Sequence, residues 1–224
     1  MTTATDQPVA GPPRRSGRRR EALGDHVARV VVALQEQVLR QPPRPEAVST
    51  LARLRRGVGR TPGFDYTLAT HLAVPDDLLG FRPADDAIPA DTEYAVHDAI
   101  TLFALHQQSR SERMHTNGQG LGQALARLAR ASTGPEGVRR RFAALGTAST
   151  YPESIYHLRG LVAMLREHQI PLDYGLIADD LRKLRKPERR PDIQAIWGRE
   201  YFRSQPNENG TDQPATTNPE ERSA

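Results

Sequence analysis

The residues of this chain that are best suited to specific chemistry are its arginines. Of 31 Arg and Lys residues only Lys183 and Lys186 are lysines, so 29 are arginines. A guanidinium group presents its N–H donors in a planar fork, which fits the oxygens of a phosphate or a carboxylate. Codon bias in a GC-rich genome also favours arginine over lysine, but the origin of a residue does not decide what it binds. The composition therefore favours a partner that carries phosphates.

Three adjacent arginines stand in the segment GPEGVRRRF, residues 134–142. A run of charge is most often an ordinary solvated helix face. On packed neighbouring helices, basic residues can instead form a stripe that binds phosphates without reading bases. Both interpretations are open for the basic residues of this region, which are Arg127, Arg130, Arg139, Arg140, Arg141, Arg159, Arg166, Arg182, Lys183, Arg185 and Lys186.

Residue types that support catalysis lack the spacing that catalysis needs. The chain has no cysteine, which excludes a thiol nucleophile, a disulfide and a cysteine-ligated zinc. Seven histidines form no HExxH motif, and the spacing of His97, His106 and His115 predicts packed or surface side chains. Asp179 and Asp180 precede cations on one predicted helix, which indicates local charge pairing. We therefore expect no enzyme activity, no metal and no cofactor.

The glycines Gly118, Gly120 and Gly122 form a G-x-G-x-G pattern ahead of a predicted helix. A dinucleotide fold requires a strand before such a loop, and the sequence predicts none. A weaker contact between a nucleic-acid phosphate and this helix N-terminus is compatible with the pattern, since the same loop carries Arg110 and Arg113.

The elements that must position these residues are helices. Apolar residues recur at three- and four-residue intervals, and no segment alternates with period two, so we predict an all-α fold. Prolines and glycines interrupt residues 61–90, which predicts short helical turns in a long connection. Asp91 and Asp173 are predicted helix N-caps, and Pro135 a first helical residue. Helices are expected at 22–40, after the PPRP breaker at 42–45, from 91 to about 105, and at 120–131, 135–145, 152–168, 174–186 and 191–203.

The arginine run lies on one of these helices. Burial of Val138, Phe142 and Leu145 turns Arg139 and Arg140 towards solvent. Arg141 lies nearer the buried edge, where pairing with an acidic neighbour is the alternative to a solvent-facing position.

Only the middle of the chain has a globular composition. Residues 1–20 are a basic arm without apolar periodicity, and residues 205–224 are polar, so we expect both to be disordered. The remaining residues 21–204 are enough for a single domain, with an N-terminal lobe at about 21–115 and a C-terminal lobe at about 116–204. No apolar run approaches the roughly 20 residues of a membrane span, which predicts a cytoplasmic protein without a membrane partner.

An ordered series of motifs resembles the CasB family, the small subunit of the type I-E CRISPR Cascade surveillance complex. Residues 22–100 match this family only in being helical, and the two tails lie outside the resemblance. The resemblance implies a non-enzymatic protein with an N-terminal helical lobe and a C-terminal helical bundle. The matching segments are ALHQQ (104–108), GLGQALARL (120–128), VRRRF (138–142), HLRGLVAMLR (157–166), LDYGLIADDLRKL (172–184) and IWGREYFR (196–203).

The resemblance also implies partners and binding residues. Members of this family stack as a pair beside the CasC and CasA subunits, and they help to hold the DNA strands that open when guide RNA pairs with its target. Arg139 and Arg140 in the R-R-x-F element and Arg159 in the H-L-R element are thereby implicated in nucleic-acid contacts. The resemblance also implicates the basic C-terminal end of the helix that follows LDY, although its correspondence with other family members is looser there. The remaining candidates and that basic end comprise Arg110, Arg113, Arg127, Arg130, Arg166, Arg182, Lys183, Arg185 and Lys186.

Functions of different kinds remain to be distinguished. The first is a clamp that binds nucleic acid without sequence specificity and stabilises the R-loop, a role in which modest extra binding tips a nearly balanced strand exchange. The second is a purely structural assembly subunit whose basic face docks acidic protein surfaces. A small helical enzyme is a third, and it would require a bound metal or cofactor.

Overall fold

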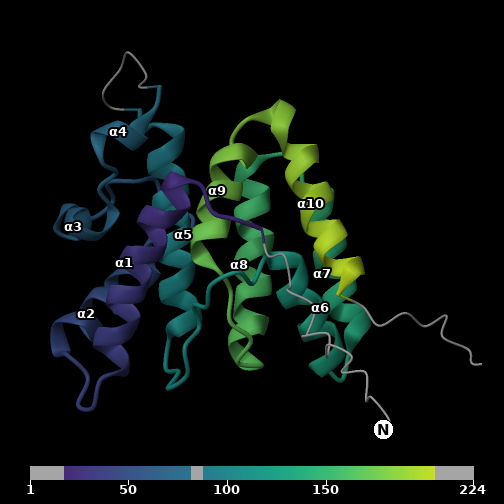
Figure 1. Ribbon diagram of the computed structural model, residues 1–224, viewed down its shortest axis with the longest axis horizontal. Coiled ribbons are helices and arrows are strands. Elements are labelled where there is room, and N and C mark those ends of the chain that lie inside the picture. Colours follow the sequence, from purple (N-terminus) through teal and green to yellow (C-terminus); the bar gives the residue numbers. More distant parts are fainter. Residues whose placement is uncertain (1–17, 82–87, 205–224) are drawn as a thin grey trace, which may run out of the picture.

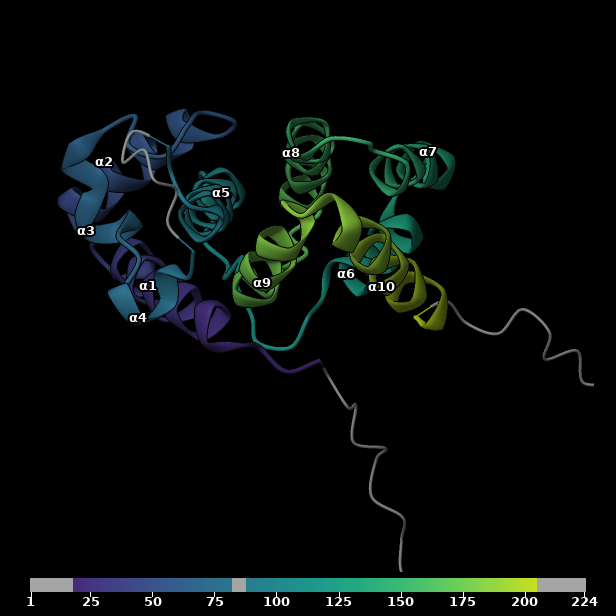
Figure 2. The same cartoon turned by 90° about the horizontal axis from the view of Figure 1, so that it is seen from above.

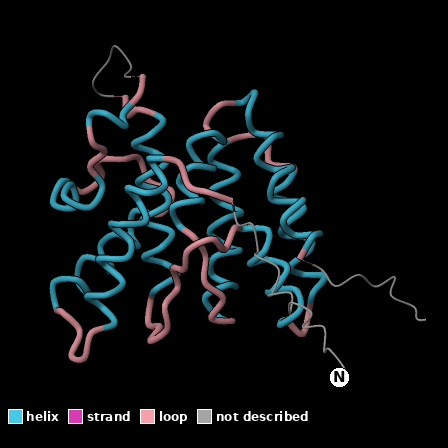
Figure 3. The backbone as a smooth tube through the Cα atoms, in the orientation of Figure 1, coloured by secondary structure: helices cyan, strands magenta, loops and turns pink. Residues whose placement is uncertain are grey.

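The protein consists of helices joined by loops (Figure 3), and the residues described by the computed structural model, 18–81 and 88–204, contain no β-strand. The all-α prediction is confirmed. The expected disordered tails fall almost entirely on residues 1–17 and 205–224, which lie outside the described residues. The elements are α1 (Ala22–Leu39), α2 (Pro45–Leu54), η1 (Arg55–Gly57), η2 (Tyr66–Leu68), α3 (Ala69–Leu72), α4 (Asp76–Leu79), α5 (Asp91–Gln107), α6 (Leu121–Ala131), α7 (Pro135–Gly146), α8 (Tyr151–Glu167), α9 (Tyr174–Leu184), η3 (Pro187–Arg189) and α10 (Arg190–Arg203).

The helices are arranged in two groups with a shared middle. Helices α1 to α5 gather on one side, α6, α7 and α10 on the other, and α8 and α9 lie between them (Figures 1 and 2). Helix α9 packs on α1 and α5, and α8 packs on α5 and α7. A single hydrophobic core therefore extends through both halves of the chain, across the predicted lobe boundary near residue 115.

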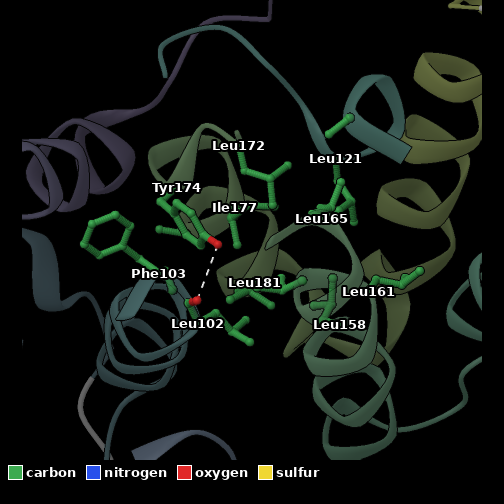
Figure 4. Close-up of a cluster of buried hydrophobic side chains, with 14 of the residues drawn as sticks. Leu102, Phe103, Leu121, Leu158, Leu161, Leu165, Leu172, Tyr174, Ile177 and Leu181 are labelled. Carbon is green, nitrogen blue, oxygen red and sulfur yellow. Dashed lines mark hydrogen bonds between the residues drawn. The ribbon is translucent and has the colours of Figure 1, made fainter. Parts of the chain in front are cut away.

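Helix α5 is at the centre of this core and is buried on nearly all sides. Residues on every side of this helix between Ala95 and Ala104 are buried, which is more than a helix with one apolar face would bury. The reason is that α1, α2, α8 and α9 all pack against it. Figure 4 shows Leu102 and Phe103 of α5 meeting Tyr174 of α9, whose ring lies 5.4 Å from that of Phe103. Deep burial of this helix gives the surrounding helices a rigid base.

The helix starts follow local signals in most places. Asp173 accepts hydrogen bonds from the backbone N–H groups of Gly175 and Leu176, at 2.9 and 3.2 Å, which confirms it as the N-cap of α9. Pro135 is the first residue of α7, as predicted. The prediction for Asp91 is wrong by one position, because Ala90 is the cap residue and the carboxylate of Glu93 accepts its backbone N–H at 2.6 Å. Asp91 is left to form an ion pair described below.

The chain segment before α1 is held against α9 and α10. Arg18 donates to Asp180 at 2.7 Å and lies 3.7 Å from Glu200, while Arg20 contacts Asp173 at 3.2 Å. In Figures 1 and 2 this purple segment runs from α1 towards α10. The prediction of a disordered arm is therefore wrong for residues 18–20, which belong to the folded structure, whereas the rest of the predicted arm lies outside the described residues. None of the helices within 18–81 and 88–204 has both the length and the apolar character to cross a bilayer.

Candidate nucleic-acid interface

The arginine run of α7 faces solvent as predicted. Val138 and Leu145 are fully buried, and the ring of Phe142 packs 5.0 Å from that of Tyr201 in α10. Arg139 and Arg140 are exposed on the opposite side of the helix. Arg141 is also exposed, forms no ion pair with an acidic residue among those described, and donates to the carbonyl oxygen of Gly137 at 3.4 Å, so the alternative of acidic pairing is wrong within the described structure.

The charges of these arginines are not equally available. Arg139 forms an ion pair with Glu136 one helical turn earlier, and this hydrogen bond holds the pKa of that carboxyl below its usual range. Arg140 makes no ion pair with any described residue. An ion pair that is exposed to solvent in this way is weak, so a phosphate can compete for Arg139. Arg140 is available without such competition.

Helix α8 carries a second exposed arginine beside an exposed aromatic ring. Arg159 is exposed and makes no ion pair with a described residue. Tyr156, one turn earlier on the same face, is 74% exposed, although a buried position is usual for so large a side chain. Sequence reasoning missed Tyr156, but its place between the buried Ile155 and Leu158 is a period-3.6 signal that it points outward.

The basic end of α9 is mostly occupied by structural ion pairs. Arg182 and Lys183 both bind the carboxylate of Glu21, whose pKa they hold below its usual value although partial burial acts to raise it. The Nε atom of Arg185 lies 2.7 Å from Asp91. Lys186 alone among the four is exposed and has no ion pair with a described residue. These four cations line a hollow of about 610 Å³ together with Leu79, Gly80, Phe81, Ile88, Pro89, Ala90, Asp91, Thr92, Glu188 and Arg189.

The remaining candidates are dispersed. Arg127 and Arg130 on α6 donate to Gln119 and to the carbonyl oxygen of Ser204. Arg166 is half-buried and donates to Gln108 at 2.8 Å. Arg110 and Arg113 lie in the loop after α5, at the opposite end of the molecule from the basic end of α9 (Figure 1). The twelve predicted residues therefore do not form one stripe, and three of the exposed ones, Arg139, Arg140 and Arg159, lie on the neighbouring helices α7 and α8.

Two glycines of the G-x-G-x-G pattern, Gly120 and Gly122, serve helix packing, whereas Gly118 adopts a positive φ of 79°. Any Cβ atom at Gly122 would collide with the backbone of Trp197 in α10, and one at Gly120 would collide with Glu200. The Glu200 carboxylate accepts the backbone N–H of Gly122 at 3.1 Å. A side-chain anion thus already occupies this helix N-terminus, where the sequence suggested a phosphate contact.

The aspartates of α9 are not paired locally, which corrects the prediction. Asp179 accepts the backbone N–H groups of Glu21 and Gly24 at 2.7 and 2.8 Å, so it caps the start of α1, and burial raises its pKa to about 6. Asp180 accepts the indole N–H of Trp197 at 2.7 Å and pairs with Arg18. Burial raises the pKa of Asp180, while the charge of Arg18 opposes this shift.

Of the two positions that the sequence left open for these three histidines, packed or at the surface, all three take the packed one. His106 lies 2.8 Å from the Tyr174 hydroxyl, and burial lowers its pKa to about 3. His115 accepts the backbone N–H of Tyr174 at 3.1 Å, and His97 lies 3.0 Å from Asp98. Among the described residues, no three His, Asp or Glu side chains gather in a way that could hold a metal ion.

Comparison with known proteins places this arrangement among CRISPR-associated proteins. The model of the family CRISPR-associated protein Cse2 matches residues 50–202. The crystal structure of CasB from Thermobifida fusca is 37% identical in sequence with a TM-score of 0.67, over 82% of this chain and 99% of that chain. A chain described as a CRISPR RNA-guided surveillance complex shares the fold, with 19% identity, a TM-score of 0.58, and coverage of 81% and 94%. No curated protein matches this sequence.

Proposed function

Because the chain belongs to the CasB family, whose model describes CRISPR-associated protein Cse2, we propose that it is the non-catalytic small subunit of a type I-E Cascade complex. In this role it acts in antiviral defence in the cytoplasm. Its partners are the CasA and CasC subunits, a second copy of itself, the target DNA strands and the guide RNA duplex.

The chemical role that we propose is a clamp on nucleic acid. The observation that carries it is the pair of exposed guanidiniums of Arg140 and Arg159 on adjacent helices, neither in an ion pair with a described residue, with Arg139 beside them. Guanidinium groups bind phosphate oxygens through paired N–H donors, and they need no base contacts to do so. A phosphate-binding face of this kind is independent of sequence and sensitive to salt.

Strand exchange explains why a few such contacts are sufficient. Replacing a DNA duplex by an RNA–DNA hybrid is nearly balanced in free energy, so small additional binding to the opened strands favours the open state. Binding through Arg139, Arg140 and Arg159 to displaced or bent strands therefore stabilises the R-loop. The basic end of α9 contributes chiefly through Lys186, since its three neighbours hold other parts of the protein together.

The experiment is charge reversal at the α7–α8 face. In the full chain, Arg140→Glu with Arg159→Glu should lower affinity for fluorescein-labelled single-stranded DNA and reduce the slope of log K against log salt by roughly 1.4, for two lost phosphate contacts. R-loop formation by the assembled complex should fall with it. The matched control is Arg40→Glu with Arg44→Glu, two exposed arginines at the turn between α1 and α2.

A purely structural subunit is the competing function, and the same variants separate the two. If the basic face docks acidic protein surfaces, the double variant leaves the complex while the isolated chain keeps its DNA affinity. Unchanged R-loop formation with normal assembly would refute the clamp.

A further inference from the structure

A second basic surface with an exposed ring lies on the N-terminal side of the molecule. It is an open hollow of about 440 Å³ formed by the end of α2, by η1 and by the segment before η2. In Figures 1 and 2, α2 and α3 lie on the opposite side of the molecule from α7, so this surface is distinct from the α7–α8 face. The residues that line it are Arg53, Arg56, Arg60, Phe64, Asp65 and Tyr66.

One ion pair fixes the frame of this hollow. Arg53 binds both oxygens of Asp65, with N–O distances between 2.7 and 3.1 Å. Asp65 also accepts the backbone N–H and the hydroxyl of Thr67, at 3.1 and 2.6 Å. The hydrogen bonds from Thr67, together with Arg53, hold the pKa of Asp65 below its usual range. The charges of Arg53 and Asp65 thus cancel, and the segment leading to η2 is held in place.

The two aromatic residues beside Asp65 have opposite environments. Phe64 is partly buried and packs edge-on against His97 of α5, with ring centroids 5.5 Å apart. A Cβ atom at Gly57 would overlap the Phe64 ring, so the glycine is what allows η1 to lie against it. Tyr66, two residues later, is 86% exposed. The partly buried Phe64 therefore anchors the segment, and Tyr66 beside it has its ring open to solvent.

The charge that remains at the hollow is positive. Arg56 and Arg60 are exposed, and neither forms an ion pair with a described residue. Asp65 is the only acidic residue that lines the hollow among the described residues, and Arg53 already neutralises it. The Arg60 guanidinium carbon lies 6.0 Å from the centroid of the Phe64 ring, a contact that leaves its N–H groups able to donate. Two guanidiniums without ion pairs to described residues, beside an exposed ring, provide phosphate contacts and a stacking surface.

We propose that this hollow is a second site for single-stranded nucleic acid, in which Tyr66 stacks on a base and Arg56 and Arg60 bind the adjacent phosphates. The choice of nucleic acid as the ligand rests on the proposed function, whereas the hollow, its cations and its exposed ring are observed independently of that function. Stacking is tolerant of sequence because every base has a π-face, so the site does not require a particular base. Two separated sites allow one subunit to hold two parts of the opened strands.

The test measures binding of the full chain to a fluorescein-labelled 20-nucleotide single-stranded DNA by fluorescence anisotropy, across a salt series. Arg56→Glu with Arg60→Glu should weaken binding about tenfold or more and reduce the log–log salt slope by roughly 1.4. Tyr66→Ala should weaken binding about fivefold with no change in slope, while Tyr66→Phe should bind as the parent does, because it keeps the ring.

The control is again Arg40→Glu with Arg44→Glu, which removes the same charge from exposed positions outside the hollow. Equal loss in this control, or parental binding by Tyr66→Ala, would overturn the second site. If only the α7–α8 variant loses affinity, the proposed function stands and the proposal of a second site at the hollow is wrong. If only the hollow variants lose affinity, the second site stands and nucleic-acid binding by the α7–α8 face is wrong.

Discussion

Arg185 should prove to be a structural residue, although its position at the basic end of α9 suggests nucleic-acid binding. Its guanidinium carbon lies 3.9 Å from the centroid of the Tyr94 ring and 4.9 Å from that of Tyr151. Its Nε atom also binds Asp91, the first residue of α5, at 2.7 Å. These contacts join the end of α9 to the starts of α5 and α8.

The expected cost of removing them can be estimated from their type. A cation over an aromatic face contributes about 0.5–2 kcal/mol depending on its solvation. The partly exposed ion pair adds about 0–1 kcal/mol. With 24% of the Arg185 side chain exposed, we expect Arg185→Ala to lower the free energy of unfolding by about 2 kcal/mol. Arg185→Lys should lose roughly half of this, because an ammonium group keeps the charge but not the planar stacking.

Urea unfolding, followed by circular dichroism, measures the stability, and fluorescence anisotropy measures DNA affinity. Lys186→Ala is the matched control, since Lys186 is an exposed neighbour and its loss should change stability by less than about 0.5 kcal/mol. We expect Arg185→Ala to be destabilised while its DNA affinity stays within about twofold of the parent under folding conditions. Parental stability combined with a large loss of affinity would refute the structural assignment.

Three further predictions concern the core. Burial keeps His106 neutral in the folded protein, whereas the unfolded chain protonates it below pH 6.5. The stability that depends on its neutral form is therefore complete above pH 6.5, and it is lost at about 1.4 kcal/mol per pH unit as the pH falls towards 3. Urea unfolding at several pH values should show that the free energy of unfolding falls less steeply with acid in His106→Phe than in the parent. Gly122→Ala should destabilise the protein by about 3 kcal/mol, because its Cβ meets the Trp197 backbone, and an unchanged melting temperature would contradict this. Asp180→Ala should cost about 3–5 kcal/mol by leaving the Trp197 indole N–H without its acceptor and Arg18 with only Glu200 at 3.7 Å. Asp180→Asn should cost less because the amide oxygen still accepts the indole N–H, and equal unfolding midpoints for the two variants would contradict this account.

Much of the fold follows from short-range patterns in the sequence. The three- and four-residue spacing of apolar side chains located the helices, and Pro135 and Asp173 marked helix starts through their own backbone chemistry. The same periodicity placed Arg139 and Arg140 on the solvent side of α7. Asp91 shows the limit of such signals, because an alanine with a glutamate three residues later forms the cap instead.

The candidate site was less predictable because charge pairing depends on distant residues. A basic run predicts cations but not their partners, so the use of Arg182 to bind Glu21 had no local signal. Tyr66 was missed for a related reason, because aromatic residues usually pack in cores and only the folded chain reveals that this ring is uncovered. Tyr156 differs, since the helical periodicity of its buried neighbours could have predicted its exposure.

The sequence alone determined that the chain is helical, where most of its long helices begin, and that an ordered set of motifs resembles one family. These properties depend on residues within a few positions of one another, which the backbone places on a common face. The tertiary structure decided which charges are available to a ligand. Glu21 meets Arg182 across 161 positions, Asp91 meets Arg185 across 94, and Glu200 reaches Gly122 across 78. Electrostatic partners are set by distance in space, so only the packing of α1, α5 and α10 around α6 and α9 separates the structural cations from those left free to bind phosphate.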